Sequence, residues 1–169
     1  EEIYKEGKNL IIWCIFKETM YKLNNLFQEK GIKVKIINGE VELEERENII
    51  KNFKNKNFNI LITNPHTLAE SVSLHTVCHD ALYFEYSYNL VHLLQSKDRI
   101  HRLGLLENQK TQYYYMQTYY DEKKFSMDKK IYERLKEKEK IMLDAIEKNI
   151  LEKSTTSKED LDIIFREFF

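Results

Sequence analysis

The sequence predicts an α/β fold in which a mainly parallel β-sheet is covered by helices on both faces. Short segments that are apolar throughout alternate along the chain with amphipathic segments of helical length. Strands that lack an apolar and polar alternation are typical of parallel sheets buried on both faces. Each connection between these segments is also long enough for the right-handed crossover that parallel neighbours require.

Five strands are predicted, and amphipathic segments separate most of them. The strands are expected at residues 10–15, 32–37, 58–63, 80–85 and 111–117. Helices are predicted over Lys17 to Lys30, where Gly31 supplies the stop, over Leu43 to Asn52, and over Asn89 to Gly104. Because ligands of parallel sheets bind beyond the carboxyl ends of the strands, we expect the functional residues at that edge.

A helical appendage is predicted after the sheet. Apolar residues at helical spacing indicate one long amphipathic helix over 128–150, and Ser157 with Asp160 forms a capping box before a last helix. We therefore expect two parts, a sheet domain over residues 1–120 and a helical extension over 121–169 that braces it.

The composition narrows the class of protein. Charged residues make up 33% of the 169 residues and hydrophobic ones 42%, which is typical of a soluble globular chain. The net charge of −1 gives no broad basic field, so any nucleic-acid contact must be local. Cys14 and Cys78 are too few for a disulfide framework, and no segment has the length of a membrane span. We expect a cytoplasmic protein, and the start without Met indicates a fragment of a longer chain.

The stretch from Gln95 to Gly104, QSKDRIHRLG, follows a predicted strand and lies at the end of a predicted helix. Its Arg99 and Arg102 are three residues apart, so on a helix both guanidinium groups would project from one face and suit a polyphosphate. The stretch resembles motif VI of superfamily 2 helicases, most closely the Snf-type DNA translocases with their pattern Q-x-x-D-R-x-x-R-x-G. A solvated basic helix end is the alternative interpretation.

The resemblance extends from about Asn9 to about Gln117. Residues 9–23 look like motif IV, and Asn38-Gly39 with Glu45-Arg46 looks like the family's G-x-x-x-x-x-x-R segment. Residues 68–74 occupy the place of motif V, where the family usually carries G-G-x-G-x-N-L. Alanine and serine replace the glycines here, and serine replaces the asparagine, so this segment departs from the pattern. The resemblance implies the C-terminal RecA-like lobe of a Snf-type helicase or translocase.

The resemblance also implies roles for single residues. Arg99 and Arg102 would act as arginine fingers that stabilise charge on the transferred phosphoryl group. The residues expected to contact the nucleotide are Gln95, Asp98, Glu70 and Gly104. The residues expected to meet the nucleic-acid backbone are Thr63, Asn64, Thr67, Ser71 and Ser73.

The chain has no phosphate-binding loop G-x-x-x-x-G-K-[ST] and no D-E-x-H motif, so it is expected to hold half of an ATP site. ATP and Mg²⁺ would be held mainly by a first lobe of the same polypeptide, and the isolated chain should hydrolyse no ATP. Double-stranded DNA is the expected nucleic-acid partner, and no membrane is expected. The alternative function is a non-catalytic adaptor that keeps the lobe for binding protein or nucleic acid.

Two further clusters have simpler explanations. His66, His75, Cys78 and His79 include a His-x-x-Cys-His run, but no second cysteine pair completes a zinc site, so no metal is predicted. The aromatic run from Tyr113 to Tyr120 is best explained as the last strand, because aromatic residues favour strands. Stacking on bases is the alternative for this run.

Overall fold

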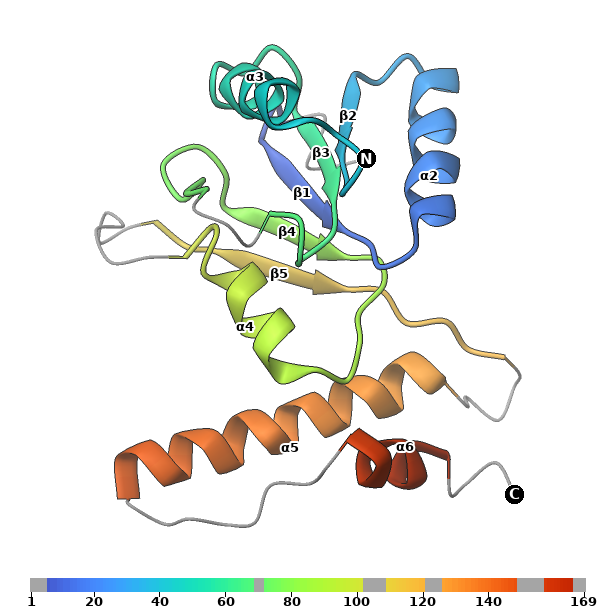
Figure 1. Ribbon diagram of the computed structural model, residues 1–169, viewed down its shortest axis with the longest axis vertical. Helices are drawn as coiled ribbons and strands as arrows, with labels where there is room; N and C mark the ends of the chain where they lie inside the picture. Colours follow the sequence, from blue (N-terminus) through green and yellow to red (C-terminus); the bar gives the residue numbers. More distant parts are fainter. Residues whose placement is uncertain (1–5, 69–71, 102–108, 121–125, 149–156, 166–169) are drawn as a thin grey trace. The chain divides into compact units, whose positions relative to one another are not determined.

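The fold is a parallel five-stranded sheet flanked by helices, which the computed structural model shows in Figure 1. The structure describes residues 6–68, 72–101, 109–120, 126–148 and 157–165. The strands are β1 (Leu10–Trp13), β2 (Val34–Ile37), β3 (Ile60–Thr63), β4 (Asp80–Tyr83) and β5 (Gln112–Tyr115). The helices are α2 (Lys17–Glu29), α3 (Leu43–Lys54), α4 (Leu90–Lys97), α5 (Met127–Lys148) and α6 (Ser157–Phe165). The predicted fold class and all five strands are confirmed.

The strand order is β2-β3-β1-β4-β5, and every neighbouring pair is parallel. The register places Trp13 at the end of β1 beside Thr63 at the end of β3 and beside Tyr83 at the end of β4. The carboxyl ends of the central strands therefore lie level at one edge of the sheet, which is the edge where parallel sheets bind ligands.

One face of the sheet packs against α2. Met20, the buried residue of α2, lies in a cluster with Ile12 of β1 and Ile62 of β3. The other buried members of this cluster are Leu10, Cys14, Ile32, Val34 and Ile60. Their alternate positions along each strand place them on the same face, because successive strand side chains point to opposite sides.

The opposite face carries a row of aromatic side chains. Trp13, Tyr83 and Tyr115 are aligned across β1, β4 and β5, with ring centroids 6.4 Å apart for the first pair and 4.8 Å for the second. The Tyr83 hydroxyl also forms a hydrogen bond of 2.7 Å with Ser96 Oγ, which fixes α4 against this face. Burial raises the pKa of Tyr83, so this phenol stays neutral.

The end of α2 follows the sequence prediction. Gly31 has a φ of +71°, a left-handed conformation that glycine adopts at little cost. The Ile32 amide then donates to the Phe27 carbonyl over 2.9 Å, which satisfies a helix-terminal carbonyl and starts the chain towards β2.

The chain forms two compact units. One comprises Glu1–Tyr86 with His92–Met116 and contains the sheet, and the other comprises Ser87–Val91 with Gln117–Phe169. In the second unit α5 and α6 pack together and bury Leu135 and Ile164. Within the described residues, no helix has the length and apolar character needed to cross a membrane.

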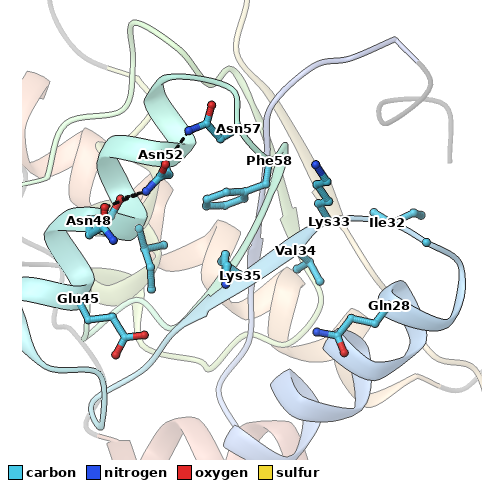
Figure 2. Close-up of a pocket in the computed structure, with 12 residues that line it drawn as sticks. Gln28, Ile32, Lys33, Val34, Lys35, Glu45, Asn48, Asn52, Asn57 and Phe58 are labelled. Atoms are coloured by element: carbon cyan, nitrogen blue, oxygen red, sulfur yellow. Dashed lines mark hydrogen bonds between the residues drawn. The ribbon is translucent and has the colours of Figure 1, made fainter.

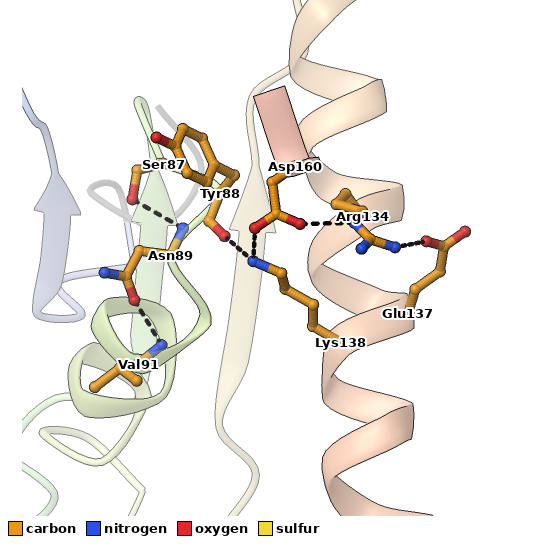
Figure 3. Close-up of polar contacts among 8 residues, drawn as sticks. All are labelled: Ser87, Tyr88, Asn89, Val91, Arg134, Glu137, Lys138 and Asp160. Carbon is orange, nitrogen blue, oxygen red and sulfur yellow. Dashed lines mark hydrogen bonds and ion pairs between the residues drawn. The ribbon is translucent and has the colours of Figure 1, made fainter. Parts of the chain in front are cut away.

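A buried ion network holds the second unit together (Figure 3). Asp160 of α6 is 1% exposed and accepts a hydrogen bond of 3.1 Å from Arg134 Nε of α5. Its other carboxylate oxygen pairs with Lys138, whose ammonium also donates to the Tyr88 carbonyl over 3.2 Å. Asp160 thus connects both helices. Through Lys138 it is also linked to the segment Ser87–Val91, which leads into α4.

Candidate functional site

The segments that resemble motifs V and VI lie together in the sheet unit. The His66 ring, in the turn after β3, lies with its centroid 3.9 Å from that of His92 in α4. Further along, the Leu74 amide donates to the Arg99 carbonyl over 2.9 Å. The first contact joins segments that follow the carboxyl ends of β3 and β4, the edge at which the sequence predicts the site. The second joins the turn before β4 to the turn after α4, which lies near the amino ends of the strands, since the Tyr113 hydroxyl at the start of β5 donates to the Lys97 carbonyl over 3.4 Å.

Asn64 builds the turn that follows β3. Its side-chain oxygen accepts hydrogen bonds from the backbone amides of His66 and Thr67, over 2.9 and 3.1 Å. Such a side-chain turn replaces the backbone bonds that a strand would supply. The amide group of Asn64 therefore has a structural role at one of the positions predicted to meet nucleic acid.

The other predicted nucleic-acid residues differ in exposure. Thr63 is fully buried, and its hydroxyl has no hydrogen-bond partner, so in this conformation it does not reach a ligand at the surface. Thr67 is half-buried, and its carbonyl accepts a hydrogen bond of 3.4 Å from Arg46 Nη1. Ser73 Oγ lies 2.5 Å from His75 Nδ1. Ser71 lies outside the described residues, as does Glu70 among the nucleotide contacts.

The helix before the arginines is shorter than predicted. α4 ends at Lys97, and the next residues form a turn in which the amides of Arg99 and Ile100 donate to carbonyls three residues earlier. The prediction of one helix to Gly104 is therefore wrong for residues 98–101. The physical reason is tertiary, because the bond from the Leu74 amide holds the Arg99 carbonyl outside a regular helix.

Arg99 does not project freely into solvent. Its side chain is 9% exposed, and its Nε donates to the Gln95 carbonyl over 3.2 Å. Gln95 and Asp98 are exposed on the same stretch and are accessible to a ligand. Arg102 and Gly104 lie outside the described residues, so the predicted pairing of the two arginines on one face remains a prediction.

Glu85 is a residue at this edge that the sequence interpretation missed. It follows β4, and its carboxylate accepts the backbone amides of Ile15 and Phe16 over 2.9 and 3.0 Å and the Thr19 hydroxyl over 2.6 Å. A negative charge at a helix N-terminus is stabilised by the helix dipole. Because α2 has no side-chain cap of its own, Glu85 fixes its start from another strand. The signal in the sequence that could have indicated this role is the acidic residue Glu85 directly after an apolar run.

A second polar network lies beside Asn38, at the end of β2. Lys17 forms an ion pair of 2.6 Å with Glu40, and this partner lowers the pKa of Glu40. Asn38 accepts the Glu40 amide over 2.9 Å and donates to the Tyr21 hydroxyl over 3.1 Å. The Asn38-Gly39 turn that resembles the family segment is thereby joined to α2.

The histidine and cysteine cluster does not assemble into a metal site among the described residues. The Cys78 thiol is buried and donates to the Asn9 carbonyl over 3.3 Å, and burial raises its pKa to about 12. His79 contacts the side-chain amide of Gln109. These contacts explain the run by packing and hydrogen bonding.

With this geometry in place, the family is clear: residues 1–104 match the Helicase conserved C-terminal domain. The match covers more than half of the chain, so the chain belongs to this family. None of the curated proteins compared with the chain matches it in sequence.

Solved structures share the fold. The crystal structure of the C-terminal part of the Fun30 ATPase domain superposes with a TM-score of 0.70 at 19% identity, over 98% of this chain and 49% of that one. Dbp5 of S. cerevisiae bound to RNA and ADP BeF3 gives a TM-score of 0.63 at 17% identity, over 80% of this chain and 34% of that one. Its C-terminal domain bound to Gle1 and IP6 gives 0.59 at 14%, over 78% and 70%. The chain thus spans about half of the Fun30 structure, and the RecA-like fold is confirmed.

Proposed function

We propose that this chain is the second motor lobe of an ATP-dependent, Snf-type DNA helicase or translocase. The observation that supports this most directly is the run Gln95 to Gly104, which matches the motif VI pattern and begins in the last turn of α4, the helix that follows β4 of a parallel sheet. In such a motor a first lobe binds ATP with Mg²⁺, and closure of the second lobe completes the catalytic site.

The two arginines would have different roles. Arg99 is held within the lobe by its bond to the Gln95 carbonyl, which suits a residue that fixes the shape of the motif VI turn. Arg102 would then supply the guanidinium group that stabilises the phosphoryl transition state. Gln95 and Asp98, which are exposed, would contact the nucleotide.

Nucleic acid would contact the segment that follows β3. Asn64 orders the turn there, and Thr67 and Ser73 place hydroxyl groups along it, with Ser71 between them in sequence. Hydroxyl and amide groups bind phosphate oxygens without reading base sequence. This suits a motor that moves along double-stranded DNA irrespective of sequence.

The decisive experiment uses the two-lobed protein. Arg102→Ala should lower ATP turnover by about 10³-fold, because an arginine finger typically contributes ~10³ to 10⁵. ATP affinity should change far less, since charge on the phosphoryl oxygens grows in the transition state. Arg102→Lys should rescue poorly, because an ammonium lacks the planar, bidentate geometry. Turnover and nucleotide affinity are measured side by side.

Arg99→Ala should lower both turnover and the melting temperature, because the side chain is nearly buried and hydrogen-bonded. Lys110→Ala is the matched control, since this exposed cation precedes β5 and lies outside the motif VI run. Near-normal turnover in both arginine variants would reduce the motif VI run to a solvated basic helix end. Absence of turnover in the parent two-lobed protein would support the non-catalytic adaptor instead. Comparing stimulation by duplex DNA and by RNA then tests the Snf-type assignment.

A further inference from the structure

A groove lies beside β2, the outermost strand on one side of the sheet. The motif VI residues follow β4, on the other side of the sheet order. The groove has a volume of about 600 Å³ and is lined by the end of α2, by β2 and the residues before it, by α3 and by the residues that precede β3 (Figure 2). Gly31 and Lys33 precede β2, and Asn57 and Phe58 precede β3, so the groove opens towards the amino ends of these strands. None of the residues predicted to bind nucleotide or nucleic acid lines it.

The strand that lines this groove has one free edge. β2 is the first strand in the sheet order and pairs with β3 alone, so among the described residues no segment pairs with its outer side. The outer backbone amides and carbonyls of an edge strand can accept an additional strand. An extended peptide could therefore extend the sheet at β2.

The charges of β2 alternate with its buried residues. Lys33 and Lys35 are exposed and lie two positions apart, on one face, while Val34 between them is buried on the other. Neither lysine has an ion pair or a hydrogen bond among the described residues. Three more exposed lysines follow at the end of α3 and in the next turn, at Lys51, Lys54 and Lys56.

The opposite wall of the groove is neutral and ordered. Asn57 Nδ2 donates to Asn52 Oδ1 over 2.6 Å, and Asn52 Nδ2 donates to Asn48 Oδ1 over 2.9 Å. Figure 2 shows these asparagines on one side of the Phe58 ring, Lys33 on the other side, and Lys35 below the ring. Glu45 is the single carboxylate among the lining residues.

From these observations we infer that the β2 groove binds an extended acidic peptide, which adds to the sheet as a sixth strand. Opposite charges on directly paired strand positions attract, so acidic side chains at every second position of the peptide would face Lys33 and Lys35. The apolar residues between them would face the side of Val34. Main-chain pairing favours a peptide over a nucleic acid, because a nucleic acid has no backbone amides and carbonyls at the spacing of a β-strand with which those of β2 could pair.

The test is made without nucleotide, so its outcome is independent of the proposed motor function. The probe is a fluorescein-labelled octapeptide in which Glu and Val alternate, and binding to the full chain is followed by fluorescence anisotropy. The alternating peptide should bind at least about tenfold more tightly than a peptide of the same composition with its four acids in one block. A version with N-methylated backbone amides should lose binding, because it cannot pair with β2.

Charge-reversal variants test the lysines. The double variant Lys33→Glu with Lys35→Glu should weaken the alternating peptide at least about tenfold and should bind an alternating Lys and Val peptide instead. Lys129→Glu with Lys140→Glu makes the same charge change on exposed positions of α5 and should leave binding unchanged. Glu45→Gln should tighten binding. Circular dichroism checks that each variant folds.

Three outcomes would overturn the inference. The first is no binding of the alternating peptide up to about 1 mM. The second is binding that survives N-methylation or the reversal of Lys33 and Lys35. The third is a short single-stranded oligonucleotide that binds through the same two lysines while the peptide does not, which would make the groove a nucleic-acid contact.

Discussion

Trp13 and Thr63 end neighbouring strands with polar side-chain atoms that have no hydrogen-bond partner. The indole Nε1 of Trp13 and the hydroxyl of Thr63 are both buried, and the two residues are paired in the register of β1 and β3. A buried polar group without a partner costs about 1–3 kcal/mol. This cost falls at the carboxyl edge of the sheet, directly before the turn built by Asn64.

The two cysteines give a prediction at the residue scale. Burial, with the nearby charge of Glu85, raises the pKa of Cys14 to about 12, and burial raises that of Cys78 to about 12. Because the thiolate is the reactive species, alkylation of the native protein at pH 8 should be about a thousandfold slower than that of a free thiol. Mass spectrometry after iodoacetamide treatment measures this, and both thiols should react quickly in denaturant. Fast labelling of either one in the native state would contradict its burial.

At the scale of elements, the strands were predictable because buried strands of a parallel sheet consist of continuous apolar residues, which the sequence shows directly. β1 and β3 are buried at every position, and the apolar runs that predict them contain no polar alternation. The end of α4 was not predictable, because the hydrogen bond from Leu74 to Arg99 joins residues far apart in sequence. For the same reason the sequence did not reveal that Arg99 is nearly buried, or that Glu85 caps α2.

The end of α3 gives a prediction for one helix. Lys56 has a φ of +58°, a left-handed conformation in which a side chain costs roughly 1–2 kcal/mol relative to glycine. Lys56→Gly removes this cost but adds backbone freedom in the unfolded state, so stability should rise by up to about 1 kcal/mol. Urea unfolding measures the difference.

Lys54→Gly is the matched control for this prediction. It also exchanges an exposed lysine for glycine, but Lys54 is the last residue of α3 and has helical backbone geometry, so glycine should lower the stability by up to about 1 kcal/mol. If both variants lose stability equally, the positive φ of Lys56 does not strain the chain.

The ion network of the second unit gives a prediction for the pair α5 and α6. Asp160 is 1% exposed and is the shared partner of Arg134 and Lys138. Asp160→Asn leaves two cations without their carboxylate in a buried place, a change that typically costs about 3–5 kcal/mol. The amide protons of α5 and α6 should then exchange much faster with solvent, whereas those of β1 and β3 should change little.

Glu137→Gln is the matched control in the same network. Glu137 also forms an ion pair with Arg134, at 2.6 Å, but its side chain is 62% exposed. An exposed pair contributes about 0–1 kcal/mol, so this variant should leave exchange in both helices nearly unchanged. Equal effects of the two substitutions would contradict the view that burial makes Asp160 important.

At the scale of the molecule, a net charge near zero hides a local separation of charge in the sheet unit. The segment from Lys51 to Asn57 contains three lysines and no carboxylate, and it lies near the amino ends of the strands. Glu40 and Glu85 lie at the opposite edge, after β2 and β4, and both are held by hydrogen bonds. The composition predicted only a weak overall electrostatic field. It gave no information on the separation of lysines from carboxylates, because this separation depends on the strand order.

The candidate site stays a prediction, although the structure shows where its residues lie. Gln95 is in the last turn of α4 and Asp98 directly follows the helix, and both are exposed. The contact between the rings of His66 and His92 was not predictable, because it depends on how the turn after β3 packs on α4. The burial of Thr63 could not be inferred either, since a threonine at a strand end can face solvent or core.

Two histidines set the expected response of the whole fold to acid. Burial lowers the pKa of His92, and the neighbouring His66 lowers it further. Burial also lowers the pKa of His79, and it has the largest effect. The charge of Asp80 raises this pKa, and His75 lowers it by a smaller amount. The unfolded chain therefore binds more protons than the folded chain below about pH 6.5, the ordinary value for histidine.

The free energy of unfolding should accordingly be constant above about pH 6.5 and fall as the pH drops through the lowered pKa values of the folded state. The upper limit is about 1.4 kcal/mol per pH unit for each histidine, and because both rings are partly exposed, solvent screening should reduce it to a few tenths. Urea unfolding at pH 7.5, 6.5 and 5.5, values that bracket the ordinary pKa of about 6.5, measures this slope. His92→Gln with His79→Gln should flatten it, because neither replacement side chain titrates. A slope that is absent from the parent chain, or unchanged in the double variant, would show that these imidazoles do not couple protonation to folding.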